Sequence, residues 1–319
     1  MSSRVTDTLL ATSQAAIAQG SKSFALASRL FAPRERDRAV LLYAWCRHCD
    51  DVIDGQALGQ GHVDYGGTPA ERLAELELQT RAALAGQVTN EPAFAALARV
   101  AAETHMPERY PLDLIEGFRM DVEGRPFQTF DDTLRYCYHV AGVVGVMMAI
   151  AMGVSPSDRA TLDRACDLGI AFQLNNIARD VVEDALNRRR YIPDDWLASE
   201  KLEPRSFAFP ANRRPLARLV TRLVDQAELY EASARYGTAA LPARAAWAVL
   251  AAADIYGNIG RKVRDLGSAG LEQRVSTSMR GKLSAVVRAL PQALSRARKW
   301  PAPGPSRAGL WTMPYPWPT

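Results

Sequence analysis

The chain has 319 residues, of which 48% are hydrophobic and 23% are charged, enough for one large domain or two ordinary domains with a sizeable core. Its formal net charge of +4 is too small to indicate a nucleic-acid-binding protein, although it suits an anionic ligand or an anionic lipid surface. Apolar residues recur at intervals of three and four through most of the chain, and strand-like alternation is scarce. The predicted fold class is therefore all-α.

The first third of the chain is expected to be a series of helices separated by glycine and proline. Helices are predicted at residues 7–19, 34–54, 69–85, 90–104 and 108–121, with a short element between Ser21 and Pro33. Residues 55–69 are polar and rich in glycine, which predicts a loop close to the end of the helix at 34–54, where a lid could form. The N-terminus lacks the apolar core of a signal peptide, so we expect a cytoplasmic protein.

The rest of the chain continues the helical pattern. A helix pair is predicted over 130–153 and further helices at 156–187, 212–236, 242–267 and 276–297. Residues 140–154 are apolar but fall short of the roughly 20 residues that span a bilayer, so a buried central helix is expected. We predict one all-α domain over 1–300. The proline-rich tail 301–319 is expected to be disordered or loosely docked.

Two acidic helical stripes are the most informative feature of the sequence. On the helix that ends at Gly55, one face carries Tyr43, Arg47, Asp50 and Asp54. The helix at 156–187 repeats this geometry with Gln173, Asn176, Asp180 and Asp184. Two carboxylates about 6 Å apart repel by roughly 3 kcal/mol at an effective dielectric constant near 20. Divalent cations such as Mg²⁺ or Mn²⁺ would remove that repulsion, because hard cations prefer oxygen ligands.

The alternative is that each stripe is an ordinary solvated helix face. The bulky apolar residues that flank both stripes, and the repetition of the pattern, favour a metal site instead. The C-x-x-C at Cys46 and Cys49, with His48 between, allows a zinc or redox interpretation. However, no second ligand pair of matching spacing exists, and the motif lies in the middle of a helix, so packing cysteines are favoured.

Opposed acidic helices in an apolar bundle are suited to gripping a diphosphate through Mg²⁺ and ionising its carbon–oxygen bond. The surrounding apolar helices would then shelter the carbocation from water. Basic residues near the motifs could contact phosphate, among them Lys22, Arg47, Arg179 and the three arginines at 188–190. Ser21 and Ser23 could add oxygen-donor contacts, although Ser21 is equally well explained as a helix cap.

These residues resemble the squalene/phytoene synthase family. The first aspartate motif of this family is similar to D-D-x-x-D at Asp50 to Asp54. Its second motif is similar to Q-L-x-N-I-x-R-D-x-x-E-D at 173–184, followed by R-Y-I-P at 190–193. The S-K-S-F segment at 21–24, the segment 136–145 and Tyr256 also match in order, so the resemblance covers roughly residues 10 to 298. Head-to-tail prenyl synthases differ, because an arginine pair follows their first motif and their second is again D-D-x-x-D.

The resemblance implies an isoprenoid-synthase bundle with a central apolar cavity. In it two prenyl diphosphates condense head to head (1-1′) through a cyclopropylcarbinyl diphosphate. The chain has no glycine-rich dinucleotide fingerprint, so no NADPH is expected. Ser28, one turn beyond Phe24, is small and would leave room for a longer substrate, which favours two geranylgeranyl diphosphates and phytoene as product. The residues at 20–24 and 275–277 also resemble those of the bacterial enzymes of carotenoid biosynthesis. The alternatives are dehydrosqualene or squalene synthesis from farnesyl diphosphate, or a non-catalytic assembly protein of the same fold.

The resemblance also implies roles for individual residues. The expected ligands of Mg²⁺ and diphosphate are Asp50, Asp54, Asn176, Asp180 and Asp184, with Asp51 and Glu183 as supporting acids. Expected diphosphate contacts are Ser21, Lys22, Ser23, Arg47, Gln173, Arg179, Tyr191 and Arg274. Tyr43, Tyr136 and Tyr256 are expected along the cation path, and the tunnel wall is assigned to Phe24, Val140, Val144, Gly145 and Leu174. Core packing is the alternative for the tyrosines and the wall residues, and the bound diphosphate is a candidate proton acceptor.

The expected product is a forty-carbon hydrocarbon. Because each buried methylene contributes up to about 0.8 kcal/mol, such a product would not leave readily for water. We therefore expect peripheral association with a membrane, through the arginine-rich residues 280–299 or the tryptophan- and proline-containing tail. Other enzymes of the carotenoid pathway are expected partners.

Overall fold

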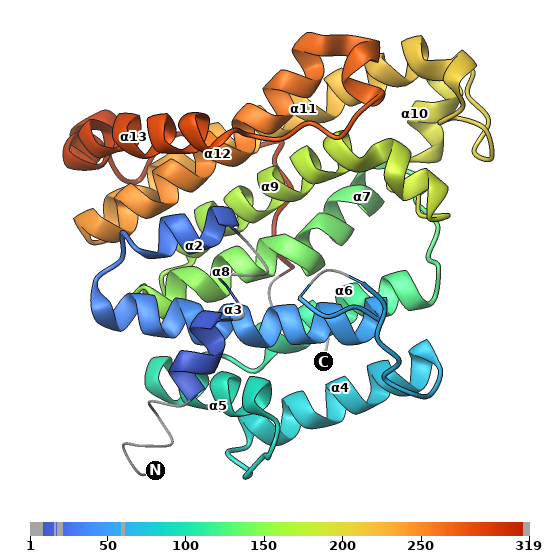
Figure 1. Ribbon diagram of the computed structural model, residues 1–319. Coiled ribbons are helices and arrows are strands. Elements are labelled where there is room, and N and C mark those ends of the chain that lie inside the picture. The colour runs from blue at the N-terminus through green and yellow to red at the C-terminus, as the bar shows by residue number, and fades with distance from the viewer. Residues whose placement is uncertain (1–8, 16, 18–21, 59–60, 315–319) are drawn as a thin grey trace.

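The computed structural model describes residues 9–15, 17, 22–58 and 61–314, with only the backbone for Lys22 and Ser23. No strand forms among these residues, and the all-α prediction is confirmed (Figure 1). The α-helices are α2 (Lys22–Ser28), α3 (Pro33–Asp54), α4 (Pro69–Leu84), α5 (Pro92–Thr104), α6 (Arg109–Val122), α7 (Phe130–Cys137), α8 (Val143–Ala151), α9 (Arg159–Leu186), α10 (Asp194–Ser199), α11 (Arg213–Gly237), α12 (Ala243–Leu266) and α13 (Met279–Lys299). Shorter helical turns are η1 (Tyr138–Gly142), η2 (Pro210–Asn212), η3 (Thr238–Ala240) and η4 (Gly267–Leu271).

The ends of the motif helices follow from their sequence signals. Helix α3 has proline at its first position and ends at Gly55, whose φ of 64° lies in the left-handed region that glycine adopts without strain. The side chain of Asp158 caps α9 by accepting a hydrogen bond from the backbone N–H of Thr161 at 3.1 Å. Both helices therefore start and stop within a few residues of the predicted bounds. The short helix α10 was not predicted.

The helix pair predicted over 130–153 is one continuous run of α7, η1 and α8. Its middle part, η1, is π-helical, a conformation that often marks functional sites. The span Phe130–Ala151 is long and apolar enough to cross a membrane by length and composition, but 67% of its most apolar window is buried inside the molecule. Core packing therefore accounts for its apolar side chains, as the sequence indicated.

Helix α9 lies in the middle of the bundle and packs against α8, α11 and α12 (Figure 1). Glycines allow its close approach to the α7–α8 run. A Cβ atom on Gly145 would lie 2.3 Å from the carbonyl oxygen of Ala165, and one on Gly169 would lie 2.1 Å from that of Ala141. The glycines of the apolar segment thus bring two helix backbones together and position the motif helix α9.

The described part of the tail packs on the body, which differs from the loose or disordered tail expected from its composition. The Arg307 guanidinium donates to both carboxylate oxygens of Asp167, at 2.7 and 2.9 Å. The backbone N–H of Trp311 donates to the Tyr230 hydroxyl at 2.9 Å, and Met313 is buried. Asp167 is fully buried, so the arginine of the tail neutralises a charge that would otherwise be costly. As expected, residues 301–314 contain no helix.

Candidate active site

Two adjoining cavities occupy the bundle between α3, α9 and the α7–α8 run. One is apolar and has a volume of about 360 Å³, and the other is polar and has a volume of about 390 Å³. They meet because six residues line both: Tyr43, Arg47, Val140, Val144, Gln173 and Asn176. Each of these six was predicted as a site residue. Gly145 lines the apolar cavity, also as predicted.

The two acidic stripes face the same polar cavity, which confirms the central structural prediction. Asp50 and Asp54 enter it from the last turns of α3, and Asp180 and Asp184 from the C-terminal half of α9. Asp51, in contrast, lines neither cavity. Its carboxylate is buried and accepts a hydrogen bond from the backbone N–H of Leu58 at 2.7 Å. It therefore holds the loop that follows the first motif.

Arginines neutralise three of the four motif carboxylates. Arg47 pairs with Asp50 on the same helix. Arg179 and Arg274 both bind Asp180, with the Arg179 Nε 2.7 Å and the Arg274 Nε 3.0 Å from its Oδ1. Arg274 approaches from outside, with 59% of its side chain exposed, and does not line the cavity.

Arg189 links the two motifs across the cavity. It follows α9, lines the polar cavity and donates to the Oδ1 of Asp54 on α3 at 2.5 Å. It also lies close enough to Asp184 to oppose the rise that desolvation causes in the pKa of that carboxyl group. In the sequence, the arginines at 188–190 are recognisable only as basic residues near the motif, because nothing local indicates which of them turns inward.

The polar cavity raises the pKa of two carboxyl groups. Desolvation, opposed by Arg47 and reinforced by Asp54, raises the pKa of Asp50 to about 6. Desolvation, reinforced by Asp180, raises the pKa of Asp184 to about 7. The Asp50 side chain lines the polar cavity and keeps 41% of its surface accessible. The cavity thus holds more negative charge than its arginines balance, which is the property expected of a cation site.

The donor set fits hard divalent cations in its chemistry, because every predicted ligand offers carboxylate or amide oxygens to one cavity. In the present side-chain arrangement, no three aspartate, glutamate, histidine or cysteine side chains of the described residues are close enough together to hold a metal ion. The arginine pairs explain this arrangement, since they occupy oxygens that a cation would take. Glu183 is 55% exposed and lies 3.7 Å from Arg274, outside the cavity lining.

A fifth aspartate of the polar cavity, Asp121 on α6, was missed. It accepts hydrogen bonds from the hydroxyls of Tyr136 at 2.9 Å and Tyr191 at 3.2 Å. The rings of these tyrosines are stacked, with their centroids 4.6 Å apart. Both were predicted site residues, and both line the polar cavity. The missed signal was helical spacing, because Leu114, Phe118 and Asp121 share one face of α6 and all line the cavity.

Aromatic side chains line the apolar cavity in stacked pairs. Phe24 stacks on Tyr43 with ring centroids 4.8 Å apart, and Phe172 stacks on Tyr256 at 4.5 Å. All four rings line the cavity, among them the predicted site residues Phe24, Tyr43 and Tyr256. Phe172 was not predicted as a site residue.

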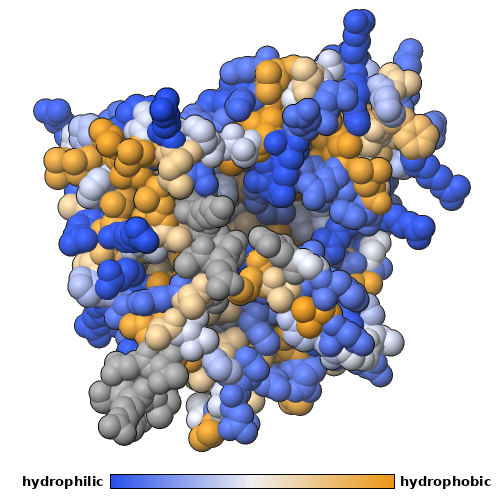
Figure 2. Space-filling view, in the orientation of Figure 1, coloured by the Kyte–Doolittle hydropathy of each residue, from blue (hydrophilic) through white to orange (hydrophobic). Residues whose placement is uncertain are grey.

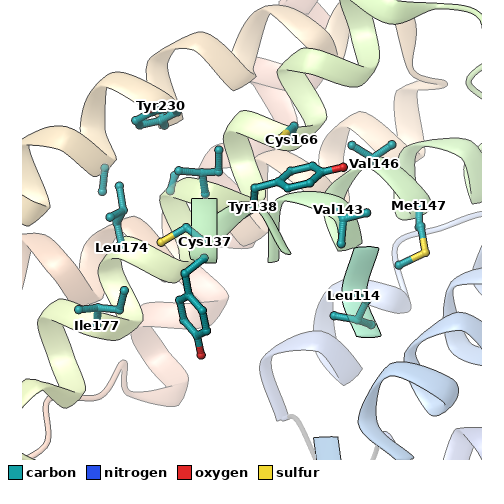
Figure 3. Close-up of a cluster of buried hydrophobic side chains, with 14 of the residues drawn as sticks. Leu114, Cys137, Tyr138, Val143, Val146, Met147, Cys166, Leu174, Ile177 and Tyr230 are labelled. Atoms are coloured by element: carbon teal, nitrogen blue, oxygen red, sulfur yellow. The ribbon is translucent and has the colours of Figure 1, made fainter. Parts of the chain in front are cut away.

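Two sequence-based interpretations of the tunnel are wrong, Leu174 as part of its wall and Ser28 as a small residue that leaves it room for a longer substrate. Leu174 points away from both cavities into a buried cluster with Ile177 and Cys137 (Figure 3). It follows Gln173 on the helix, and a step of about 100° turns it to a different face. Ser28 is also absent from the lining. Its hydroxyl donates to the carbonyl of Ala25 at 3.1 Å, whereas Ala27 and Phe31 face the apolar cavity.

The remaining assignments concern the start of α2 and the cysteines. Ser21 lies outside the described residues, and the side chains of Lys22 and Ser23 are not described. All four cysteines are free thiols, and Cys49, Cys137 and Cys166 are buried. Cys46 lines the polar cavity, and desolvation raises the pKa of its thiol to about 12, so it stays neutral.

Comparison with known proteins agrees with this geometry. Residues 17–281 match the family model for squalene/phytoene synthase. A 15-cis-phytoene synthase of Pantoea ananas is 52% identical over 93% of this chain and 96% of its own length. Another 15-cis-phytoene synthase, from Paracoccus sp., is 50% identical over 96% of this chain and 98% of its own length. A solved dehydrosqualene synthase with a bound ligand has 27% identity and a TM-score of 0.81, and covers 92% of this chain and 99% of that one. The chain therefore belongs to the squalene/phytoene synthase family.

Proposed function

We propose that the protein is a phytoene synthase, a prenyltransferase that condenses two geranylgeranyl diphosphates head to head and releases diphosphate. The observation that carries this proposal is the joined pair of cavities, in which both acidic motifs face a polar chamber that opens into an apolar one. The two relatives that are 50% and 52% identical over nearly their whole lengths, both 15-cis-phytoene synthases, support the choice of product.

In this proposal the polar cavity binds the diphosphates together with Mg²⁺ or Mn²⁺. The ligands would be Asp50, Asp54, Asn176, Asp180 and Asp184. The bound ions would neutralise the leaving diphosphate and so ease its ionisation. Arg47, Arg179 and Arg189, which now pair with the carboxylates, would be released to donate to phosphate oxygens. The exchange would keep these three arginines paired with anions before and after binding.

The apolar cavity would hold the prenyl tails and the carbocation. The rings of Tyr43 and Tyr256 lie in its lining, each stacked on a phenylalanine. Aromatic faces attract cations and offer no strong nucleophile to trap them, so these rings are suited to the path between the two ionisation steps. Gln173 and Asn176, at the junction of the cavities, would orient the diphosphate ends.

A second candidate is dehydrosqualene synthesis from two farnesyl diphosphates. It is favoured by the overall similarity to the solved dehydrosqualene synthase, but at only 27% identity. A non-catalytic role is disfavoured, because both acidic motifs are intact and face one cavity. We also propose a cytoplasmic location at a membrane surface, where a hydrocarbon product could pass to lipid and to other enzymes of the carotenoid pathway.

The test is turnover of labelled geranylgeranyl or farnesyl diphosphate by purified protein in detergent, with Mg²⁺ and without NADPH. We expect phytoene from the twenty-carbon substrate. Asp180→Asn should abolish turnover and keep the helical circular dichroism, whereas Asp131→Asn, at an exposed ion pair with Arg135, should remain active. Turnover of farnesyl diphosphate alone would contradict the proposed substrate. Full activity of Asp180→Asn would contradict the assigned site.

A further inference from the structure

Helix α13 carries a row of exposed apolar side chains that no described segment covers. Its members follow at intervals of four, four, three and four, so they share one helix face, the α13 stripe: Met279 (63% exposed), Leu283 (57%), Val287 (63%), Leu290 (39%) and Leu294 (70%). Hydrophobic side chains gather on the surface at the end of the molecule where α13 and α12 lie (Figure 2). A contiguous exposed apolar surface of this kind marks a site of interaction.

The α13 stripe is not the face that packs on the bundle. The buried residues of α13 are Ala285, Val286, Ala289 and Ala293. The helix is fastened to α12 by the Trp247 indole N–H, which donates to the carbonyl of Val286 at 2.7 Å, and to Leu241 by Arg296 at 2.9 Å. Helix α13 therefore packs on the bundle through a different face, and the α13 stripe is not needed for that packing.

The charged residues of α13 are all basic. Helix α13 has six basic residues and no acidic residue, and all 35 acidic residues of the chain precede residue 273. Residues 1–272 contain 31 basic residues against those 35 acids, so they carry a net charge of −4. With about 100° between successive residues, Arg280 and Arg298 fall about 60° from the middle of the α13 stripe. Both are exposed and lie along the same edge of the apolar row.

This charge pattern decides between the possible occupants. A second copy of the chain would place two strongly basic helices against each other, with no acid on either to compensate. The tail 301–314 is engaged elsewhere, through Arg307, Trp311 and Met313. An anionic lipid surface instead complements both features, because it accepts apolar side chains at the acyl boundary and basic ones at the headgroups.

We propose that α13 is an interfacial helix that docks the protein on an anionic bilayer, with the α13 stripe inserted below the headgroups. Helix α12 lies directly beneath α13, and its side chains Ala248, Val249 and Ala252 line the apolar cavity. Docking through α13 therefore places that cavity one helix away from lipid. The role given to docking, which is delivery of a hydrocarbon product to lipid, rests on the proposed function. The docking surface is inferred independently of that function.

Flotation of the full-length protein with vesicles tests this surface. We expect binding to vesicles in which phosphatidylglycerol makes up about a third of the lipid, and at least about tenfold weaker binding to pure phosphatidylcholine. The stripe variant carries Leu283→Ser, Val287→Ser and Leu294→Ser. It should bind anionic vesicles at least about tenfold more weakly than wild type. Its matched control carries Leu78→Ser, Val88→Ser and Phe209→Ser, at side chains that are 63%, 99% and 59% exposed elsewhere, and should bind like wild type.

A charge-reversal pair tests the electrostatic part of lipid docking. Arg280→Glu with Arg298→Glu should weaken binding to anionic vesicles, whereas Arg205→Glu with Arg214→Glu, at exposed sites near η2, should not. Equal flotation of the stripe variant and wild type would overturn the proposal. So would a wild-type dimer in detergent-free solution that the stripe variant converts to a monomer. Turnover in detergent, measured for every variant, reports the proposed catalytic function separately and should stay at the wild-type level.

Discussion

Binding of a divalent cation by this protein should weaken steeply as the pH falls from about 8 to 6. The reason is that protons compete for Asp50 and Asp184, whose pKa values are raised from 3.8 to about 6 and about 7. Because these pKa values are raised, the neutral carboxyl group persists to higher pH. Metal affinity is therefore present at pH values above the two pKa values, and it is lost as the pH falls through them. If Asp50 and Asp184 titrate independently, their protonation lowers the apparent affinity for the cation about 20-fold at pH 6 and about 1000-fold at pH 5, relative to pH 8.

The same calculation with ordinary carboxyl groups gives a different result. Two aspartates with a pKa of 3.8 would change the apparent affinity only about 1.1-fold between pH 8 and 5. The steep dependence therefore comes from the desolvation of Asp50 and Asp184 and from the carboxylate neighbours of each group, not from the mere presence of acids.

Electron paramagnetic resonance of free Mn²⁺ in the presence of the full-length protein measures this affinity directly. Asp184→Asn removes the group with the higher pKa and should leave only about a twofold change between pH 8 and 6, from Asp50 alone. Asp131→Asn, at an exposed ion pair on α7, should keep the full wild-type dependence. A wild-type affinity that changes less than about twofold over this range would refute the reasoning.

Three further predictions concern the bundle around the site. Gly169→Ala should lower the free energy of unfolding by about 1–3 kcal/mol or more in a urea titration, because the added Cβ would lie 2.1 Å from the carbonyl oxygen of Ala141. Arg307→Ala should lower it by about 3–5 kcal/mol, because the charge of the fully buried Asp167 loses its guanidinium partner at 2.7 and 2.9 Å. Ala27→Phe should fill part of the apolar cavity, so farnesyl diphosphate should outcompete geranylgeranyl diphosphate in a mixed-substrate assay.

Matched variants provide the controls for these predictions. Gly281→Ala on α13 would place its Cβ 3.0 Å from the Cγ2 of Thr277, a contact that a shift of a few tenths of an ångström relieves, so stability should change much less than for Gly169→Ala. Arg205→Ala, at an exposed position, should also be nearly neutral. Ala25→Phe lies on α2 outside the cavity lining and should leave the substrate preference unchanged. If any control changes its readout as much as its test variant does, the physical reason given for that test variant is wrong.

The sequence alone determined the helices and the faces they present. The period of 3.6 residues placed Asp50 with Asp54 and Asp180 with Asp184, and the cost of grouped carboxylates indicated that the two faces belong together. The same period explains one error. Leu174 adjoins Gln173 in the chain, but adjacent positions on a helix face different sides, so it belongs to the core.

Only the tertiary structure decided which partners meet these faces. Arg189 reaches Asp54 across 135 positions of the chain, and Arg274 reaches Asp180 across 94. The tail is held in the same way, since Arg307 binds Asp167 across 140 positions. Local periodicity carries no information about such distant pairs, because it fixes the direction of a side chain relative to its own helix axis and not the position of the helix that lies opposite. For the same reason, the sequence could mark α13 as basic and apolar, but only the packed bundle showed which of its faces remains exposed.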